Sequence, residues 1–265
     1  MRLRLANGLS IAYRTRGAGP TILLMHPVGV RGAFWDAVIA ELEGEFRLIA
    51  PDFRGHGDSD ASADDFKLGD LAADMAELLR AAGQPPAVAV GCSMGGMVAQ
   101  ALACEAPELL RGFVIANTAH RRDDAGRATM EQRASRAKKG MPTVLDTTLS
   151  RWFDAPTLVA RPELAARAKN WLLEADPVVH ARAWRAIRDL NYAERLKANK
   201  TPALAIAGLR DQSTPVAAMR AMANDIPRCG YREIDSGHLA PLEEPALFAA
   251  LLREFAGGLA QGQQR

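Results

Sequence analysis

The sequence has few cysteines and no long apolar run, and each shortage excludes a class of protein. Its three cysteines, Cys92, Cys104 and Cys229, are odd in number and widely spaced, so they predict neither a disulfide framework nor a zinc or redox motif. No stretch approaches the roughly 20 apolar residues of a membrane-spanning helix, and the first residues do not have the pattern of a signal peptide. We expect a cytoplasmic protein that does not bind a membrane.

An excess of charge of one sign is also missing. Lys and Arg total 33 against 31 Asp and Glu, which gives a formal net charge of +2 at pH 7. This balance gives no reason to expect a nucleic acid partner. Hydrophobic residues make up 48% of the chain and charged residues 24%, as in an ordinary packed globular protein. A length of 265 residues is enough for one large domain or two small ones.

Strand-like and helix-like segments alternate through residues 9–116 and again through 203–256. The short apolar run at 87–92 is typical of a strand buried on both faces, whereas 68–82 has the apolar spacing of an amphipathic helix. Strict alternation of this kind predicts a mostly parallel sheet with helices on both faces. We therefore predict the α/β fold class.

Residues 118–199 interrupt the alternation with a charged, alanine-rich segment of helical period. Inserted segments usually enter at exposed loops, and open α/β sheets bind ligands at the carboxyl ends of their strands. We predict a core domain formed by residues 1–117 and 200–265, and a helical lid (cap) formed by 118–199 above those strand ends. The glycine- and glutamine-rich tail, 257–265, is expected to be disordered.

The segment from Gly91 to Gly95 reads Gly-Cys-Ser-Met-Gly and lies between a predicted strand and a predicted helix. A G-x-S-x-G motif in that context is typical of a sharp turn that exposes the serine at the mouth of a sheet, with glycines where side chains would collide. The bare motif is weak, but the flanking strand and helix make it specific. We expect Ser93 to be a nucleophile.

A serine nucleophile needs a base, and His238 is the best placed of the five histidines. It lies in a loop between the last predicted strand and the last predicted helix, from which it can reach Ser93. His26 is interpreted as bracing a loop, and His56 as structural. His120 and His180 lie in the helical segment, and we interpret both as surface or lid residues without a catalytic role.

The base in turn needs a carboxylate, which should follow a strand between Ser93 and His238. Asp211 follows the predicted strand 203–207 and meets this requirement. The end of the preceding strand carries Asn117 and no acid. Asp235 remains as a weaker alternative.

Acyl transfer also needs hydrogen-bond donors for the developing oxyanion. One expected donor is the backbone N–H of Met94, the residue after the nucleophile. The other should come from the loop after the strand 21–25, where Pro27 has no N–H and Val28 is the natural candidate.

These motifs, taken in order, resemble the α/β-hydrolase superfamily along nearly the whole chain. A narrower resemblance rests on residues 116–119, 151–153, 176–177 and 186–190. These residues resemble the 3-oxoadipate enol-lactonase group, and the resemblance implies hydrolysis of a small carboxylated enol-lactone. His26-Pro27 departs from the Asn-Ser common at that place in the group, and the start of the helical segment also differs. The narrow resemblance therefore favours a small-ester or lactone hydrolase over any one substrate.

The helical segment carries 16 Lys and Arg residues against 10 Asp and Glu, and a cationic lid would attract an anionic substrate. Arg188 is the candidate for gripping a carboxylate, with Trp152 and Trp184 as candidate walls of the pocket. We expect no metal or cofactor. Two alternatives keep Ser93, His238 and Asp211 but change the reaction: a broad carboxylesterase or perhydrolase, and a carbon–carbon bond hydrolase. A third alternative is a non-catalytic small-molecule binding protein. A homo-oligomer is left open.

Overall fold

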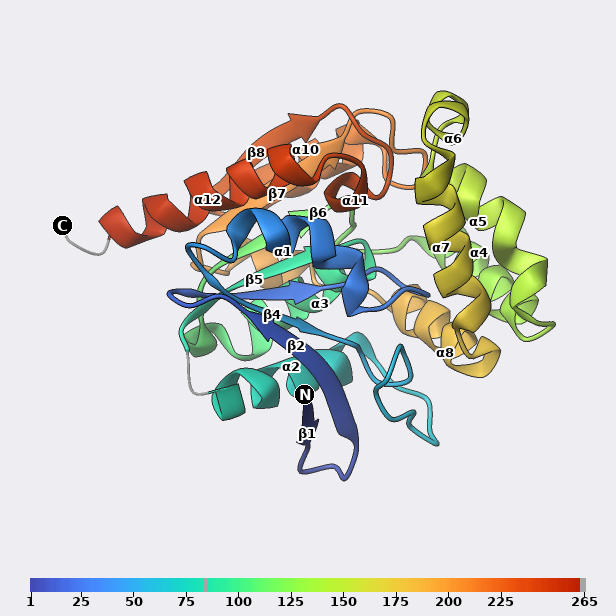
Figure 1. The fold of residues 1–265 in the computed structure, drawn as a ribbon, viewed down its shortest axis with the longest axis horizontal. Helices are drawn as coiled ribbons and strands as arrows, with labels where there is room; N and C mark the ends of the chain where they lie inside the picture. The colour runs from blue at the N-terminus through green and yellow to red at the C-terminus, as the bar shows by residue number, and fades with distance from the viewer. Residues whose placement is uncertain (83–84, 263–265) are drawn as a thin grey trace.

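The computed structural model describes residues 1–82 and 85–262, and an eight-stranded sheet forms its centre (Figure 1). The strand order is β1-β2-β4-β3-β5-β6-β7-β8, with β1 and β2 antiparallel to their neighbours and the others parallel. This arrangement confirms the predicted α/β class. The strands are β1 (Arg2–Arg4), β2 (Ser10–Arg16), β3 (Thr21–Met25), β4 (Arg47–Pro51), β5 (Ala87–Cys92), β6 (Leu110–Ala116), β7 (Ala203–Gly208) and β8 (Cys229–Ile234).

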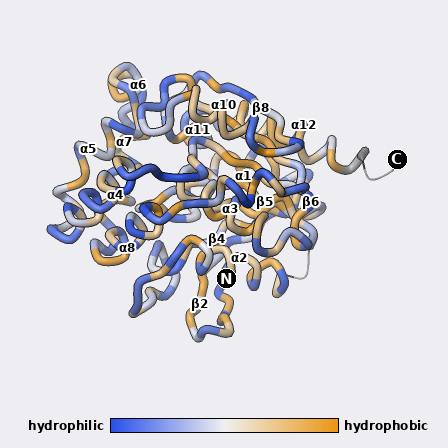
Figure 2. The backbone as a smooth tube through the Cα atoms, turned by 180° about the vertical axis from the view of Figure 1, so that it is seen from behind, coloured by the Kyte–Doolittle hydropathy of each residue, from blue (hydrophilic) through white to orange (hydrophobic). Residues whose placement is uncertain are grey.

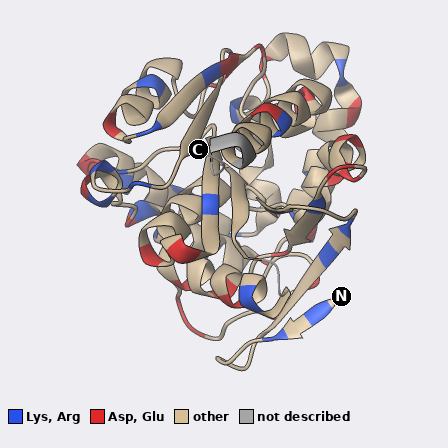
Figure 3. Ribbon diagram, turned by 90° about the vertical axis from the view of Figure 1, so that its left-hand side faces the viewer, with Lys and Arg blue, Asp and Glu red and all other residues tan. Residues whose placement is uncertain are grey.

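The central strands are apolar because they are covered on both faces. Every residue of β3, β5 and β7 is buried, as expected of parallel strands that lie between two layers of helices. Figure 2 shows the hydrophobic colour concentrated along these central strands. In Figure 3 most of the central sheet carries no charge, and both signs are mixed over the outer helices and loops. The core therefore lies between the sheet and its helices.

Two layers of helices cover the sheet. One face carries α1 and α12, which pack on each other, together with the short α11. The other face carries α2, α3 and α10. These helices are α1 (Asp36–Leu42), α2 (Leu68–Ala82), α3 (Met94–Glu105), α10 (Val216–Asp225), α11 (Ala240–Glu243) and α12 (Pro245–Gly262), and two 3₁₀ helices are η1 (Gly32–Trp35) and η2 (Pro107–Leu109).

Residues 118–199, which we call the helical block, contain six α-helices and one 3₁₀ helix between β6 and β7. Aspartates cap three of them: the side chains of Asp123, Asp154 and Asp176 accept hydrogen bonds from backbone N–H groups of the first turn. These caps explain why the helices begin where they do. The block comprises α4 (Asp124–Ala137), η3 (Met141–Val144), α5 (Leu145–Trp152), α6 (Ala155–Ala160), α7 (Pro162–Glu174), α8 (Pro177–Arg188) and α9 (Ala193–Lys197).

Helices α4 to α8 lie together beyond one end of the sheet (Figure 1). They contact the loops that follow the carboxyl ends of the strands. A Cβ atom on Gly29, after β3, would lie 2.7 Å from the ring of His180, and one on Gly55, after β4, would lie 2.6 Å from Val179. Arg182 also donates to the carbonyl oxygen of Ser62 over 2.8 Å. The block therefore packs on the edge of the sheet at which ligands of open α/β folds bind.

The C-terminal segment differs from the sequence-based expectation. Residues 257–262 continue α12 as a helix, so the expected disorder is wrong for them, and residues 263–265 lie outside the described part of the chain. Apolar residues on both sides of these glycines, Phe255 and Leu259, pack against Gly112 of β6, and this packing favours continuation of the helix. The three-residue strand β1 was not predicted, since so short a segment has no readable period.

Candidate active site

Ser93 lies at the turn between β5 and α3, in a backbone conformation that side chains rarely adopt. Its φ is 54° and its ψ is −116°. A Cβ atom on Gly91 would run into the backbone of Gly95, and one on Gly95 would run into the carbonyl oxygen of Met25. The turn closes only with glycine at both places, which is the physical reason for the motif. It leaves the Ser93 side chain at the carboxyl end of the sheet.

His238 and Asp211 come to Ser93 from loops that follow β8 and β7. His238 Nε2 lies 3.0 Å from Ser93 Oγ, and His238 Nδ1 lies 2.9 Å from Asp211 Oδ2. The carboxylate can only accept, so Nδ1 carries the proton and Nε2 accepts from the serine hydroxyl. The structure thus joins the three residues, which are 145 and 27 positions apart along the chain, in one hydrogen-bond chain.

Asp211 is held by donors on both carboxylate oxygens. Oδ1 accepts from the backbone N–H groups of Ser213 and Thr214, and Oδ2 also accepts from Asn117 Nδ2 over 2.9 Å. Burial raises the pKa of this carboxyl, but the charge of His238 and these hydrogen bonds outweigh burial and hold the pKa below its usual value. Asp211 is therefore ionised at neutral pH.

The alternative acid, Asp235, is turned away from this chain of hydrogen bonds. Its exposed carboxylate is paired with Arg210. Cys92, the neighbour of the serine, is fully buried, and burial raises the pKa of its thiol well above the usual value. Neither residue is placed to act on a ligand at Ser93. Within residues 1–82 and 85–262, no cluster of His, Cys, Asp and Glu could hold a metal ion.

The two expected oxyanion donors belong to the residue after the serine and to the loop after β3, the strand next to β5. Met94 is the first residue of α3, so its N–H has no acceptor four residues back in the helix. Val28 lies in the loop after β3, and no described residue accepts from its N–H. His26 braces this loop, because its Nδ1 bonds to Pro27 O over 2.7 Å and its Nε2 accepts from Phe53 N–H over 3.0 Å. Both backbone donors remain available to a ligand.

The three candidate residues of the helical block have different surroundings. The carbonyl oxygen of Trp152 accepts the backbone N–H of His238 over 3.0 Å, while its side chain is buried. Trp184 Nε1 donates to His180 Nε2 over 2.9 Å. Arg188 makes no hydrogen bond to His238 or His180. Each of its three guanidinium nitrogens donates to a carboxylate, of Glu131 or of Asp189. We therefore do not retain Arg188 as a ligand contact.

His180 is a residue that the sequence-based interpretation missed. It is 1% exposed, and its ring covers Gly29 in the loop that carries Val28. Because Nε2 accepts from Trp184, the neutral ring carries its proton on Nδ1, which has no partner in the described structure. Burial, with the charges of His56 and Arg151, lowers the pKa of His180 to about 3. Its spacing on a helix gave no sign of this burial.

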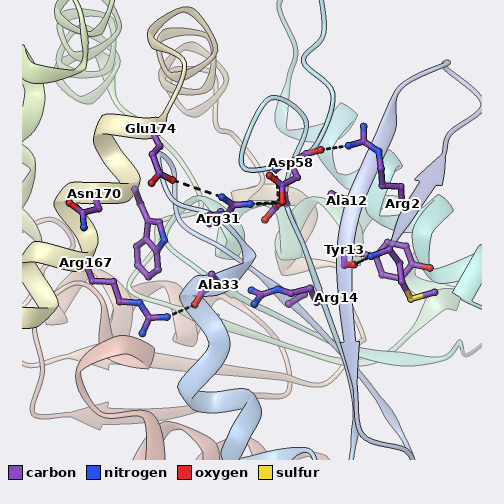
Figure 4. Close-up of a pocket in the computed structure, with 14 residues that line it drawn as sticks. Arg2, Ala12, Tyr13, Arg14, Arg31, Ala33, Asp58, Arg167, Asn170 and Glu174 are labelled. Atoms are coloured by element: carbon purple, nitrogen blue, oxygen red, sulfur yellow. Dashed lines mark hydrogen bonds and ion pairs between the residues drawn. The ribbon is translucent and has the colours of Figure 1, made fainter.

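A cavity of about 680 Å³ lies elsewhere, between the N-terminal strands and α7 (Figure 4). Most of its charged side chains are paired, either with one another or with a carboxylate outside the lining: Arg31 lies 2.6 Å from Asp58 and 3.9 Å from Glu174, and Arg167 lies 3.4 Å from Asp36. Neither the serine of the turn nor its two partners line it. This cavity offers a ligand little unpaired charge, and we do not assign it to the reaction.

None of the helices in the described part of the chain is both long and apolar enough to cross a membrane. A family model described as "alpha/beta hydrolase fold" matches residues 20–245. The chain is 26% identical over 246 residues to 3-oxoadipate enol-lactonase 2 of Acinetobacter baylyi, a match that covers 92% of this chain and 91% of the relative.

Two solved structures have nearly the same fold along their whole length. The malate-bound esterase from Thermogutta terrifontis superimposes with a TM-score of 0.92 at 29% identity, over 98% of this chain and 99% of the other. The enol-lactonase from Burkholderia xenovorans LB400 gives a TM-score of 0.92 at 27% identity, over 97% and 100%. Together with the family match, they show that this chain belongs to the α/β-hydrolase family.

Proposed function

We propose that this protein is a serine hydrolase of small carboxylic esters or lactones. The observation that carries the proposal is the hydrogen-bond chain from Ser93 through His238 to Asp211, with distances of 3.0 and 2.9 Å. Serine is a poor nucleophile by itself, and a hydrogen-bonded base whose cationic form is stabilised by a carboxylate is what activates it. The family and the enol-lactonase and esterase relatives support the same reaction class.

Each group of the site has one role in the proposed reaction. Ser93 Oγ attacks the carbonyl carbon while His238 Nε2 takes its proton, and Asp211 stabilises the resulting imidazolium. The N–H groups of Val28 and Met94 bind the oxyanion of the tetrahedral intermediate. His238 then protonates the departing alkoxide. Water repeats the sequence on the acyl-enzyme and releases the acid, so one water molecule is consumed for each ester bond broken.

The helical block supplies the proposed lid of this site. It covers the loops after β3, β4 and β8, and Trp152 contacts the backbone of the proposed base. Trp152 and Trp184 are the proposed walls on the lid side. Two of the relatives are named enol-lactonases. An enol-lactone that carries a carboxylate is therefore the substrate that we propose to test first.

The test is covalent labelling combined with turnover of a p-nitrophenyl ester. The wild-type protein should release p-nitrophenol and should gain the mass of a fluorophosphonate probe at Ser93. Ser93→Ala should lose both while it keeps the wild-type melting temperature. Ser135→Ala, which changes an exposed serine on α4, is the matched control and should keep both. Wild-type rates in Ser93→Ala would overturn the proposal and leave the binding-protein alternative.

A further inference from the structure

The helical block encloses a second cavity, of about 540 Å³, between α4, α5 and α8. All of its lining residues belong to residues 129–184. Three of them are arginines, Arg133, Arg136 and Arg151, and none carries a carboxylate. Trp184 forms part of the wall, with the guanidinium of Arg133 at 4.8 Å and that of Arg151 at 5.5 Å from its ring centre. The cavity is therefore cationic and partly aromatic.

Arg133 and Arg151 lack the counter-ions that neighbouring arginines have. Arg185 and Arg188, on the same helix as Trp184, are both paired with Glu131. No Asp or Glu of residues 1–82 and 85–262 pairs with Arg133 or Arg151. Arg151 Nη2 is buried without a hydrogen-bond partner.

Such an arrangement is unfavourable without a ligand. Partly buried cations that repel one another lose hydration without gaining an ion pair. Burial and the nearby charge of Arg133 lower the pKa of Arg151 to about 9, while Asp211 acts in the opposite direction. Burial and the charge of Arg122 lower the pKa of Arg133 to about 10. An anion bound between these side chains would remove this cost, because it supplies the missing counter-charge and hydrogen-bond acceptors.

Two residues of the cavity wall, Arg151 and Trp184, are linked to groups beside the proposed catalytic residues. Arg151 immediately precedes Trp152, whose carbonyl oxygen accepts from His238, and Arg151 is close enough to Asp211 for that carboxylate to affect its pKa. Trp184 bonds to His180, which covers the loop of the proposed oxyanion donors. A ligand that used both regions would have to carry its negative charge some distance from the carbonyl that Ser93 attacks, because Ser93, His238 and Asp211 do not line this cavity.

We propose that Arg133 and Arg151, stacked on Trp184, bind an anionic group of the substrate, a carboxylate or a phosphate, remote from the scissile bond. This inference rests on the proposed function and narrows its substrate class to anionic esters or lactones. In place of Arg188, whose guanidinium is paired with carboxylates, it assigns the anion to two arginines that no carboxylate of the described residues pairs with. The planar guanidinium groups suit a carboxylate or phosphate, to which they donate parallel hydrogen bonds.

The first test compares two esters of the same shape. Mono-p-nitrophenyl glutarate ends in a carboxylate, and p-nitrophenyl 5-methylhexanoate has two methyl groups in place of its two oxygens. The wild-type protein should prefer the glutarate in kcat/KM. Arg133→Met and Arg151→Met should each reduce the ratio of the two kcat/KM values by about 10- to 100-fold, as expected for a lost hydrogen bond to a charged group.

Arg127→Met is the matched control, because Arg127 is exposed on the same helix as Arg133 and pairs with Asp189. It should keep the wild-type ratio. An unchanged ratio in Arg133→Met and Arg151→Met would overturn the inference, as would a wild-type protein with no preference between the two esters. Equal losses of kcat/KM on both esters would show that these arginines only support the fold, and this result would also overturn the inference.

A binding measurement separates this inference from the proposed function. Glutarate and inorganic phosphate are titrated by calorimetry into Ser93→Ala and into the same protein with Arg151→Met. Binding that disappears with Arg151→Met supports the anion subsite even if no ester is turned over, and the preferred anion distinguishes carboxylate from phosphate. Absence of binding by both anions would overturn the subsite, whereas turnover and probe labelling at Ser93 would still support the hydrolase.

Discussion

Asn117 donates a hydrogen bond from Nδ2 to Oδ2 of Asp211 over 2.9 Å, although 94 positions separate the two residues. Asn117 follows β6 and has a φ of 49°, so its side chain is directed at the oxygen that also accepts from His238. A carboxylate at position 117 would therefore reach the same region as the carboxylate at position 211. This relationship permits a test of the proposed acid.

Asp211→Asn should reduce kcat about 10³- to 10⁴-fold, because the amide no longer stabilises the imidazolium and favours the wrong tautomer of His238. Adding Asn117→Asp to that variant should recover part of the loss, since the new carboxylate lies beside the same ring nitrogen. Steady-state kinetics of the single and double variants on one p-nitrophenyl ester measures the recovery. Asp235→Asn is the control and should keep the wild-type rate, whereas a double variant as slow as Asp211→Asn would contradict the prediction.

Stability should fall as the pH decreases from 7.5 to 5.5. His26, His56, His120 and His180 are buried, and burial lowers the pKa of each of them. Below pH 6.5 the unfolded chain binds protons on these rings that the folded chain does not bind. The free energy of unfolding therefore decreases with falling pH, by up to about 1.4 kcal/mol per pH unit for each ring.

Urea unfolding at several pH values between 5.5 and 7.5 measures how the free energy of unfolding depends on pH. This range lies above the pH at which most carboxylates titrate. His180→Gln removes one of the four rings, so the free energy of unfolding of this variant should depend less steeply on pH, by up to about 1.4 kcal/mol per unit. A wild-type protein whose free energy of unfolding is constant across the range would show that these histidines titrate normally in the fold.

The sequence predicted best what depends on neighbours along the chain. The turn at Ser93 follows from glycines two residues away on each side, and the positions of Asp211 and His238 follow from the strands that precede them. The sequence could not separate Arg188 from Arg151, because ion pairing depends on how helices pack. Arg188 meets Glu131, 57 positions away, only because α4 lies against α8. The packing of α8 on the loop after β3 likewise buries His180, whose helical position resembled a surface site.

The close approach at Gly95 gives a prediction about stability. Because a Cβ atom there would run into the carbonyl oxygen of Met25, Gly95→Ala must displace the start of α3 from β3. We expect a loss of more than about 2 kcal/mol in the free energy of unfolding, together with loss of ester turnover. Gly257→Ala in α12 is the control: the space around Gly257 is open, and alanine should stabilise the helix by up to about 1 kcal/mol. Chemical denaturation measures the free energy of unfolding of both variants. Equal stability of Gly95→Ala and the wild type would contradict the close contact.

Arg151→Met should make the protein without ligand more stable, although it is expected to weaken anion binding. It removes a buried donor without a partner and lowers the repulsion with Arg133, while the methionine side chain keeps most of the apolar contact with Trp184. A rise of about 2–4 °C in melting temperature would correspond to roughly 1 kcal/mol. Glutarate should raise the melting temperature of the wild type and leave that of the variant unchanged, because a ligand stabilises only the state that binds it. A residue that served only to support the fold would give the opposite result, a lower melting temperature in the variant and the same response to glutarate in both proteins.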